Sequence, residues 1–233
     1  MRDLTLTWIG QGGFLLRDGQ TTLCVDPYLS DVVNRVAGRP RMVAPPIAPE
    51  ALCCDAVFCT HNHLDHVDID AIPKMPLDGM RFYAPTDAEK TLRECGVKHY
   101  HPFDEGAHVQ IGDFSVKSVF AAHSCPTIGL VIRHGDHTLY ISGDTEYDER
   151  LEALATEGVD VMFICINGKL GNMNVKEAIR LTERVAPRVG VPMHYGMFES
   201  NTEDPQNYTA YIPHGFEMEL GRETSIKEIL NHV

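Results

Sequence analysis

The chain has 233 residues, of which 43% are hydrophobic and 23% are charged, and its formal net charge is −13 at pH 7. This composition is typical of a globular protein rather than a disordered one. The negative charge argues against a nucleic-acid partner, which normally needs a basic face. No apolar run approaches the roughly 20 residues of a membrane span, and the first residues lack the basic-then-apolar pattern of a secretory signal. We therefore expect a cytoplasmic protein that acts on neither nucleic acid nor a membrane.

The length allows one large α/β domain or two small ones, and no linker-like segment divides the chain, so we expect residues 1–233 to form a single domain. The first part is predicted to be rich in strands, with turns at Gly12–Gly13 and Asp18–Gly19. Its strands are expected at 4–9, 13–18, 21–26 and 55–60. The last of these is a continuous apolar run, which is typical of a buried central strand. A helix is predicted over 86–95.

The second half of the chain shows a similar alternation of strands and helices. Strands are predicted at 108–111, 114–123, 129–134, 137–144, 159–166 and 188–194. A helix over 148–158 is expected to end at Gly158, and Asn174 with Glu177 has the spacing of a capping box at the start of another helix. Strands with helices interposed in each half predict a layered α/β domain whose helices lie outside the sheets.

The most unusual stretch of the sequence is THNHLDHVD, at the end of a predicted buried strand. His61, His63, Asp65 and His66 follow the pattern H-x-H-x-D-H within it. Because alternate side chains of an extended segment share a face, His61 and His63 can bind one ion together. The turn after them can direct Asp65 and His66 to a second position a few ångströms away. Asp68 lies beyond this pattern, and we expect it to start the next segment.

Three later residues end apolar runs in the same way, namely His123, Asp144 and His194. Each alone would be interpreted as a capping aspartate or a hydrogen-bonded core histidine. Together, and in this order, they predict further metal ligands at the ends of strands.

The succession H-x-H-x-D-H, His, G-D-T and His resembles the metallo-β-lactamase fold superfamily over nearly the whole chain. The stretches TWIGQGGFLLRDGQTTLCVDPYL and INGKLGNMNVKEAIRLTERVAPRVGVPMHYGMFESNTEDP are similar to its UlaG-like L-ascorbate-6-phosphate lactonases. The resemblance implies a four-layer αββα sandwich. It also implies two ligand sets: His61, His63 and His123 for a first metal, and Asp65, His66 and His194 for a second, with Asp144 bridging both. Gln11 stands where many relatives have histidine.

Imidazole and carboxylate donors without thiolate suit Zn²⁺, Mn²⁺ or Fe²⁺, so two divalent metal ions are the expected cofactors. The seven cysteines are an odd number, they form no Cys-x-x-Cys pair, and most lie within apolar runs. We expect them to be reduced, buried thiols rather than disulfides or ligands.

These features predict a hydrolase in which a metal-bound hydroxide opens an ester-type bond of a small molecule. The subgroup resemblance favours a sugar-acid or phosphorylated sugar lactone. The negative charge of the chain does not exclude an anionic substrate, because bound divalent metals reverse the local field. Asp65 is predicted to orient the hydroxide or to carry its proton. Two alternatives remain, a phosphodiesterase acting on a nucleotide, phospholipid-like or RNA substrate with the same two metals, and a non-hydrolytic di-iron redox protein.

Substrate contacts are predicted from residues that follow strands on the expected active edge. The candidates are Asn167, Lys169 and Tyr195. A solvated loop position for Lys169 and wall packing for Tyr195 remain alternative interpretations. The sequence leaves the oligomeric state open, and a homo-oligomer is one option.

Other polar residues near the motifs have two interpretations. Asp26 is expected either to support a metal ligand or to be an ordinary turn residue. Asn201 and Asp204 are expected to cap the segment that follows them. The Pro-rich stretch 39–50 is predicted to be a rim or lid, and the histidines outside the ligand set, including His134, are expected at the surface or in turns.

Overall fold

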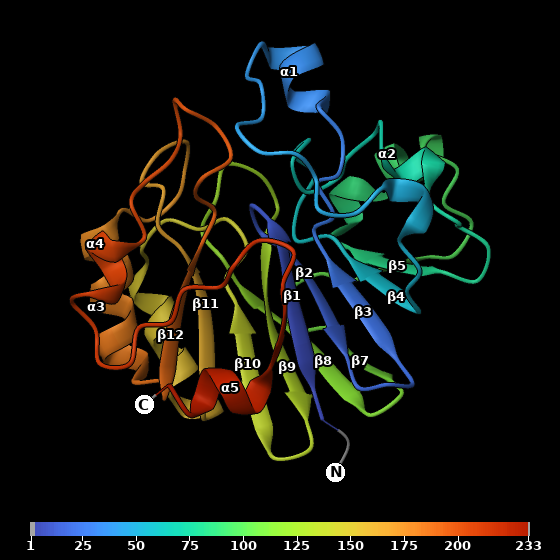
Figure 1. Cartoon of the computed structure of the whole chain (residues 1–233). Helices are drawn as coiled ribbons and strands as arrows, with labels where there is room; N and C mark the ends of the chain where they lie inside the picture. The colour runs from blue at the N-terminus through green and yellow to red at the C-terminus, as the bar shows by residue number, and fades with distance from the viewer. Residues whose placement is uncertain (1–2, 233) are drawn as a thin grey trace.

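The structure is a computed structural model and describes residues 3–232. Two β-sheets packed face to face form the centre of the molecule (Figure 1). Helices cover the outer surfaces, with α3 (Val175–Val185) and α4 (Gln206–Thr209) on one side and α2 (Glu89–Glu94) on the other (Figure 1). The predicted four-layer αββα sandwich is therefore confirmed.

The first sheet has seven strands in the order β13-β1-β2-β3-β4-β5-β6. Their bounds are β13 (Glu223–Ser225), β1 (Thr5–Gly10), β2 (Gly13–Arg17), β3 (Thr22–Val25), β4 (Ala56–Phe58), β5 (Arg81–Ala84) and β6 (Tyr100–Pro102). Strands β3 to β6 are parallel, and Val25 lies opposite Phe58 in the register of β3 and β4. The residues that follow these two strands therefore emerge side by side at one edge of the sheet.

The second sheet has six strands in the order β12-β11-β10-β9-β8-β7. Their bounds are β12 (Val189–Met193), β11 (Val161–Cys165), β10 (His137–Ile141), β9 (Ile128–His134), β8 (Phe114–Phe120) and β7 (His108–Ile111). Strands β10, β11 and β12 are parallel. Because β8 and β10 both pair antiparallel with β9, β8 ends at the same edge as these three strands.

Apolar side chains from both sheets fill the space between them. Phe14 of β2 and Phe163 of β11 have ring centroids 4.7 Å apart across this interface, and both are buried. A second apolar cluster joins the outer face of the first sheet to α2 through Leu92, Phe82 and Val57. The sheets are thus fixed on both faces, which gives a rigid support to the loops at their edges.

The predicted capping box at the start of α3 is present. Asn174 Oδ1 accepts a hydrogen bond from the Glu177 backbone N–H at 3.1 Å, and Glu177 Oε2 accepts one from the Asn174 backbone N–H at 3.0 Å. The helix predicted over 148–158 is instead the 3₁₀ helix η4 (Glu149–Glu157), which ends as expected at Gly158 in the left-handed region. An α-helix has 3.6 residues per turn and a 3₁₀ helix has 3.0, and the sequence pattern of so short a segment does not distinguish them.

Short elements escaped the sequence analysis because they carry too few residues to show a period. They are α1 (Val32–Ala37), η1 (Pro49–Ala51), η2 (Ile72–Lys74), α5 (Ile226–Leu230) and the strands β5, β6 and β13, together with α4. The helix predicted over 86–95 is present as η3 (Thr86–Ala88) followed directly by α2. The expected surface position of His134 is wrong, since it is buried with Nε2 3.2 Å from Asp18 Oδ2.

Two other sequence expectations are tested by the fold. The seven cysteines are free thiols, and Cys24, Cys59, Cys95 and Cys165 are buried as expected, whereas Cys53 is exposed and Cys54 and Cys125 are half-buried. Within residues 3–232, the helices are all too short or too polar to cross a membrane.

A buried carboxylate, that of Asp68, joins the histidine loop, which is the loop after β4 that begins at His61, to the segment after β3. Asp68 accepts hydrogen bonds from the backbone N–H groups of Leu29 at 2.9 Å and Ser30 at 2.8 Å, and from the Ser30 hydroxyl at 2.6 Å. It also accepts from the backbone N–H of Ala71 at 2.9 Å and that of Asp70 at 3.1 Å, which confirms that Asp68 starts the next segment. This single side chain therefore holds two loops together.

Replacement of Asp68 by alanine is expected to destabilise the fold by about 3 kcal/mol, because buried N–H groups would lose their acceptor. Asp70→Ala is the matched control, since Asp70 forms a partly exposed ion pair with Arg35 and should cost within about 1 kcal/mol. Urea unfolding of both variants measures the difference, and equal losses would contradict this role of Asp68.

Candidate metal centre

All seven predicted ligands lie at the edge where strands of both sheets end. His61, His63, Asp65 and His66 come from the loop after β4. The other three follow β8, β10 and β12, and they are His123, Asp144 and His194. The sheets thus bring together residues that are more than a hundred positions apart in the sequence.

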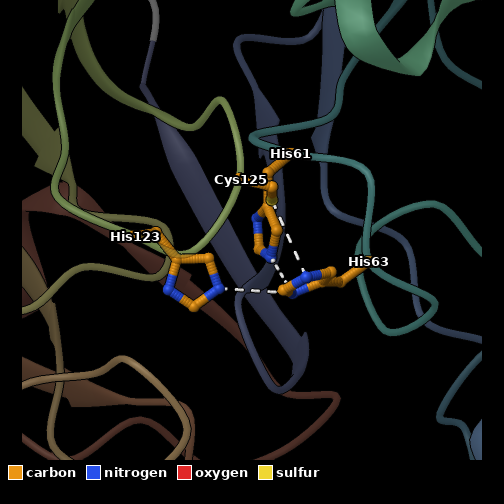
Figure 2. A group of neighbouring side chains, drawn as sticks. All are labelled: His61, His63, His123 and Cys125. Atoms are coloured by element: carbon orange, nitrogen blue, oxygen red, sulfur yellow. Dashed lines mark hydrogen bonds between the residues drawn. The ribbon is translucent and has the colours of Figure 1, made fainter.

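Three histidines form the first cluster, with ring nitrogens that converge on one point. His63 Nδ1 lies 2.9 Å from His61 Nε2 and 3.2 Å from His123 Nε2 (Figure 2). Burial lowers the pKa of His61 well below its ordinary value and also lowers the pKa of His63, and neighbouring imidazoles add to both shifts. Both rings are therefore neutral, the form of imidazole that binds metal ions.

Asp65, His66 and His194 form the second cluster, in which their ligand atoms lie within 4.8 Å of one another. Asp144 lies between the two clusters. Its Oδ1 is 3.0 Å from His194 Nε2 and 3.3 Å from His66 Nε2, and its carboxylate also groups with His61. This is the position of a ligand that two neighbouring ions would share.

The second cluster is strongly negative for a buried site. Burial lowers the pKa of His194, but the carboxylates of Asp144 and Asp65 outweigh burial and raise it to about 9. For His66 the effect of burial is likewise outweighed, by Asp26, Asp144 and Asp65, and its pKa lies well above the ordinary value. The carboxylates thus hold protons on these rings, and a divalent cation is able to replace those protons.

Two polar atoms inside the site that lie close to each other but lack a hydrogen bond support the fit of a metal. His66 Nε2 and Asp144 Oδ1 are both buried, and neither has a hydrogen-bond partner within residues 3–232. Buried polar atoms are nearly always paired. Two such atoms 3.3 Å apart, each a common metal ligand, are explained by an ion that both would coordinate.

The outer nitrogens of the ligand rings are held by the protein. His66 Nδ1 donates to Asp26 Oδ2 at 2.8 Å, and His123 Nδ1 donates to the Gly171 carbonyl at 2.8 Å. Asp26 also accepts from the backbone N–H and the hydroxyl of Thr60, each at 2.7 Å. Such outer partners fix the ring that a metal binds, so of the two interpretations of Asp26 the structure favours the supporting one.

Gln11, Asp26 and His194 adopt left-handed backbone conformations, with φ of 52°, 42° and 62°. Each directly follows a strand, β1, β3 or β12, so the turn redirects its side chain toward the site. Residues other than glycine adopt this region at a cost, and they cluster at functional sites. Gln11 uses its position to donate from Nε2 to Asp65 Oδ2 at 2.9 Å, a role that the sequence did not reveal.

A cavity of ≈ 500 Å³ opens over the two clusters. Its described lining comprises His63, Asp65, Asp144 and His194 from the clusters, and Val33, Arg39, Leu64, Ser124, Leu170, Phe198 and Asn201 around them. The stretch 39–50 therefore contributes a rim through Arg39, as expected.

The three predicted substrate residues lie behind or beside this lining. Asn167 donates from Nδ2 to Asn201 Oδ1 at 3.0 Å, Lys169 donates from Nζ to the Ser200 carbonyl at 3.0 Å, and the Tyr195 ring packs 4.9 Å from that of Trp8. Their contact with substrate stays a prediction.

Asn201 and Asp204 are both expected from the sequence to cap the following segment, and the structure shows a different outcome for each. Asn201 does not cap the following segment but is buried beside Asn167 at the cavity wall. Asp204 accepts from the Gln206 backbone N–H at 3.0 Å, next to the start of α4.

Some site residues gave no signal in the sequence. Asn172 donates from Nδ2 to Asp144 Oδ2 at 2.9 Å, and Cys125 Sγ lies 3.7 Å from His63 Nε2. The position of Cys125, two residues after a predicted ligand, was the available clue. Leu170 and Phe198 reach the cavity only because of the path of their loops, and the hydrophobic periodicity of the sequence does not predict that path.

Replacement of Asp26 by alanine is expected to weaken metal binding at the second cluster about 10- to 100-fold, because His66 would lose its fixed orientation. Competition with a chelator measures the affinity. Asp18→Ala is the matched control: Asp18 is also a buried carboxylate after a strand, bound to backbone N–H groups of Gln20 and Thr21, but it lies at the opposite edge. Unchanged metal affinity in the Asp26 variant would show that Asp26 does not support the site.

Comparison with known proteins agrees with this geometry. Residues 21–195 match the Beta-lactamase superfamily domain. A UPF0173 metal-dependent hydrolase of Anaeromyxobacter sp. (strain K) is 30% identical over 233 residues, covering 89% of this chain and 80% of the relative. One from Methanosarcina mazei is 27% identical over 220 residues, covering 89% of this chain and 90% of the relative.

The same fold is found in a solved structure, described as a possible metal-dependent hydrolase from Veillonella parvula. It has a TM-score of 0.80 and 20% identity, and the match covers 97% of this chain and 100% of that one. The fold, the matched domain and the relatives agree, and the chain belongs to the metallo-β-lactamase superfamily, within its family of UPF0173 metal-dependent hydrolases.

Proposed function

We propose that this metal-dependent hydrolase opens an ester-type bond in a small anionic molecule, with a sugar-acid or phosphorylated sugar lactone as the favoured class. The observation that carries the proposal is the pair of ligand clusters joined by Asp144 at the floor of a cavity of ≈ 500 Å³. A cavity of this volume suits a small molecule rather than a polymer. The similarity of the sequence to the lactonase subgroup favours the ester-type bond.

His61, His63 and His123 would hold one divalent ion and Asp65, His66 and His194 a second, with Asp144 between them. Such ions supply an activated water at neutral pH and polarise the bond under attack. The donor set suits Zn²⁺ or Mn²⁺, and Fe²⁺ is compatible with it.

We infer that Asp65 orients the attacking water. It lines the cavity, and its Oδ2 accepts from Gln11 Nε2 and lies 3.6 Å from His194 Nε2. Burial raises the pKa of Asp65, but His66 and His194 outweigh burial, and the pKa lies far below its ordinary value. The side chain is therefore a carboxylate at neutral pH, able to accept a hydrogen bond from water, and the low pKa favours orientation over proton storage.

The cavity walls support an anionic substrate with an apolar part. Val33, Leu64, Leu170 and Phe198 provide apolar surface. Arg39 is the only lysine or arginine among the described lining residues, and it is exposed. Since no hydrogen bond or ion pair engages its guanidinium within residues 3–232, Arg39 is free to bind a phosphate or carboxylate of the substrate.

A substrate panel tests the proposal with protein loaded with Zn²⁺ or Mn²⁺. We expect the protein to open sugar lactones, which is measured by the release of acid, and to cleave model phosphodiesters little. Asp65→Asn should lower lactone turnover at least about 100-fold through loss of water orientation, while metal analysis shows retained metal. Phosphodiester cleavage without lactone opening would reject the lactone and support the alternative two-metal phosphodiesterase.

Replacement of Arg39 by alanine is expected to raise KM for a phosphorylated lactone about tenfold or more, with little change in kcat, because a charge-assisted contact is made in ground state and transition state alike. The KM for an uncharged lactone should not change. Arg35→Ala is the matched control, because Arg35 lies in α1 only four residues before Arg39 but pairs with Asp70 away from the cavity. Equal KM changes for charged and uncharged lactones would contradict this role.

A further inference from the structure

A cysteine thiol lies against the first ligand cluster. Cys125 follows His123 by two residues in the loop between β8 and β9, and it is half-buried. Its Sγ is 3.7 Å from His63 Nε2 (Figure 2). In Figure 2, dashed lines run from His63 to His61, to His123 and to Cys125, so His63 joins the thiol to the cluster.

The two nitrogens of His63 have different surroundings. Nδ1 faces His61 and His123 and is the nitrogen available to a metal. A neutral ring that coordinates through Nδ1 must carry its proton on Nε2, and that N–H needs an acceptor. Sγ of Cys125 is the partner that the structure gives to Nε2 within residues 3–232.

The other two rings of the cluster have oxygen acceptors at the corresponding place. His61 Nδ1 lies 3.1 Å from Thr60 Oγ1, and His123 Nδ1 donates to the Gly171 carbonyl. Gly171 has φ of 87°, and a Cβ there would come within 2.7 Å of His123 Nδ1, so the carbonyl approaches the ring closely. The third ring has a sulfur where these two have oxygen.

The thiol itself is held by Thr127. The Thr127 hydroxyl donates to the Cys125 carbonyl at 2.8 Å, and its oxygen lies 3.7 Å from Sγ. The hydroxyl proton is therefore used, and the oxygen can accept the S–H proton. The sulfur lone pairs then face His63. The result is a chain of three hydrogen bonds that all run in one direction. His63 Nε2–H donates to Sγ, the S–H donates to Thr127 Oγ1, and the Thr127 hydroxyl donates to the Cys125 carbonyl.

We propose that Cys125 is a positioning residue that accepts the Nε2–H of His63 and so holds Nδ1 toward the first metal position. The inference rests on the metal centre and does not depend on which bond the protein cleaves. Direct ligation by Cys125 is the competing arrangement, since Sγ is within 4.8 Å of a ligand nitrogen of each of the three histidines. Sγ, however, contacts Nε2 of His63, whereas Nδ1 of that ring faces the other two histidines. With Asp144 shared between the two positions, the first metal would already have four protein ligands, and a thiolate would be a fifth.

The test compares Cys125→Ala and Cys125→Ser with Cys53→Ala, which removes an exposed thiol. Zn²⁺ alone is the probe, and its affinity for each position is measured in the full chain by chelator competition. We expect Cys125→Ala to weaken the first position about 10- to 100-fold and to leave the second position unchanged. Cys125→Ser should restore most of the affinity, because a hydroxyl also accepts from Nε2–H and donates to Thr127. Cys53→Ala should match the unaltered protein.

Two further measurements separate positioning from packing and from ligation. The melting temperature of the metal-free protein should change little in all variants, because Cys125 is half-buried and Cys53 is exposed, so neither replacement opens a cavity in the core. Cobalt-loaded protein should show no sulfur-to-cobalt charge-transfer band. Such a band, if lost in Cys125→Ser, would establish direct ligation and overturn the proposal. Unchanged Zn²⁺ affinity in Cys125→Ala, or equal weakening of both positions together with a lower melting temperature, would overturn it too.

Discussion

Parallel pairing within each sheet is the constraint on which the site depends. Parallel strands start at one edge of a sheet and end at the other, so the residues after β3 and β4, and those after β10 and β12, emerge together. The apolar interface between the sheets then sets the two edges against each other. His123 reaches the same edge because β8 and β10 both pair antiparallel with β9, so strand pairing brings together candidate ligands from loops far apart in the sequence.

Charge is the second requirement of this edge. Asp65 and Asp144 are carboxylates beside largely buried histidines, and their attraction for protons on His66 and His194 is the same attraction that a metal ion would satisfy. Hydrogen bonds from surrounding groups fix the orientation of the charged side chains. Gln11 donates to Asp65 and Asn172 donates to Asp144, so ligands are in place before any ion arrives, and little ordering is left to oppose binding.

The sequence located the candidate ligands better than the wall of the cavity, for a physical reason. Each candidate ligand ends an apolar run or lies in the loop directly after one, so its place near a strand end is a local property of the chain. A wall residue faces the cavity only through the path of a loop, as Leu170 and Phe198 do. Tyr195 illustrates the difference: it adjoins His194, but the left-handed turn at His194 sends the next side chain onto Trp8.

The bonds to Asp68 have a consequence for how this protein can change. The groups that reach its carboxylate from the segment after β3 are mostly backbone N–H groups, those of Leu29 and Ser30, and a backbone bond does not depend on the side chain. The helical segment and rim that follow, with Val33 and Arg39, can therefore accept new residues while their anchor persists. One part of the cavity wall and the candidate ligands thus lie on separately exchangeable parts of the chain, so this part of the wall can change while the loops that carry the ligands do not.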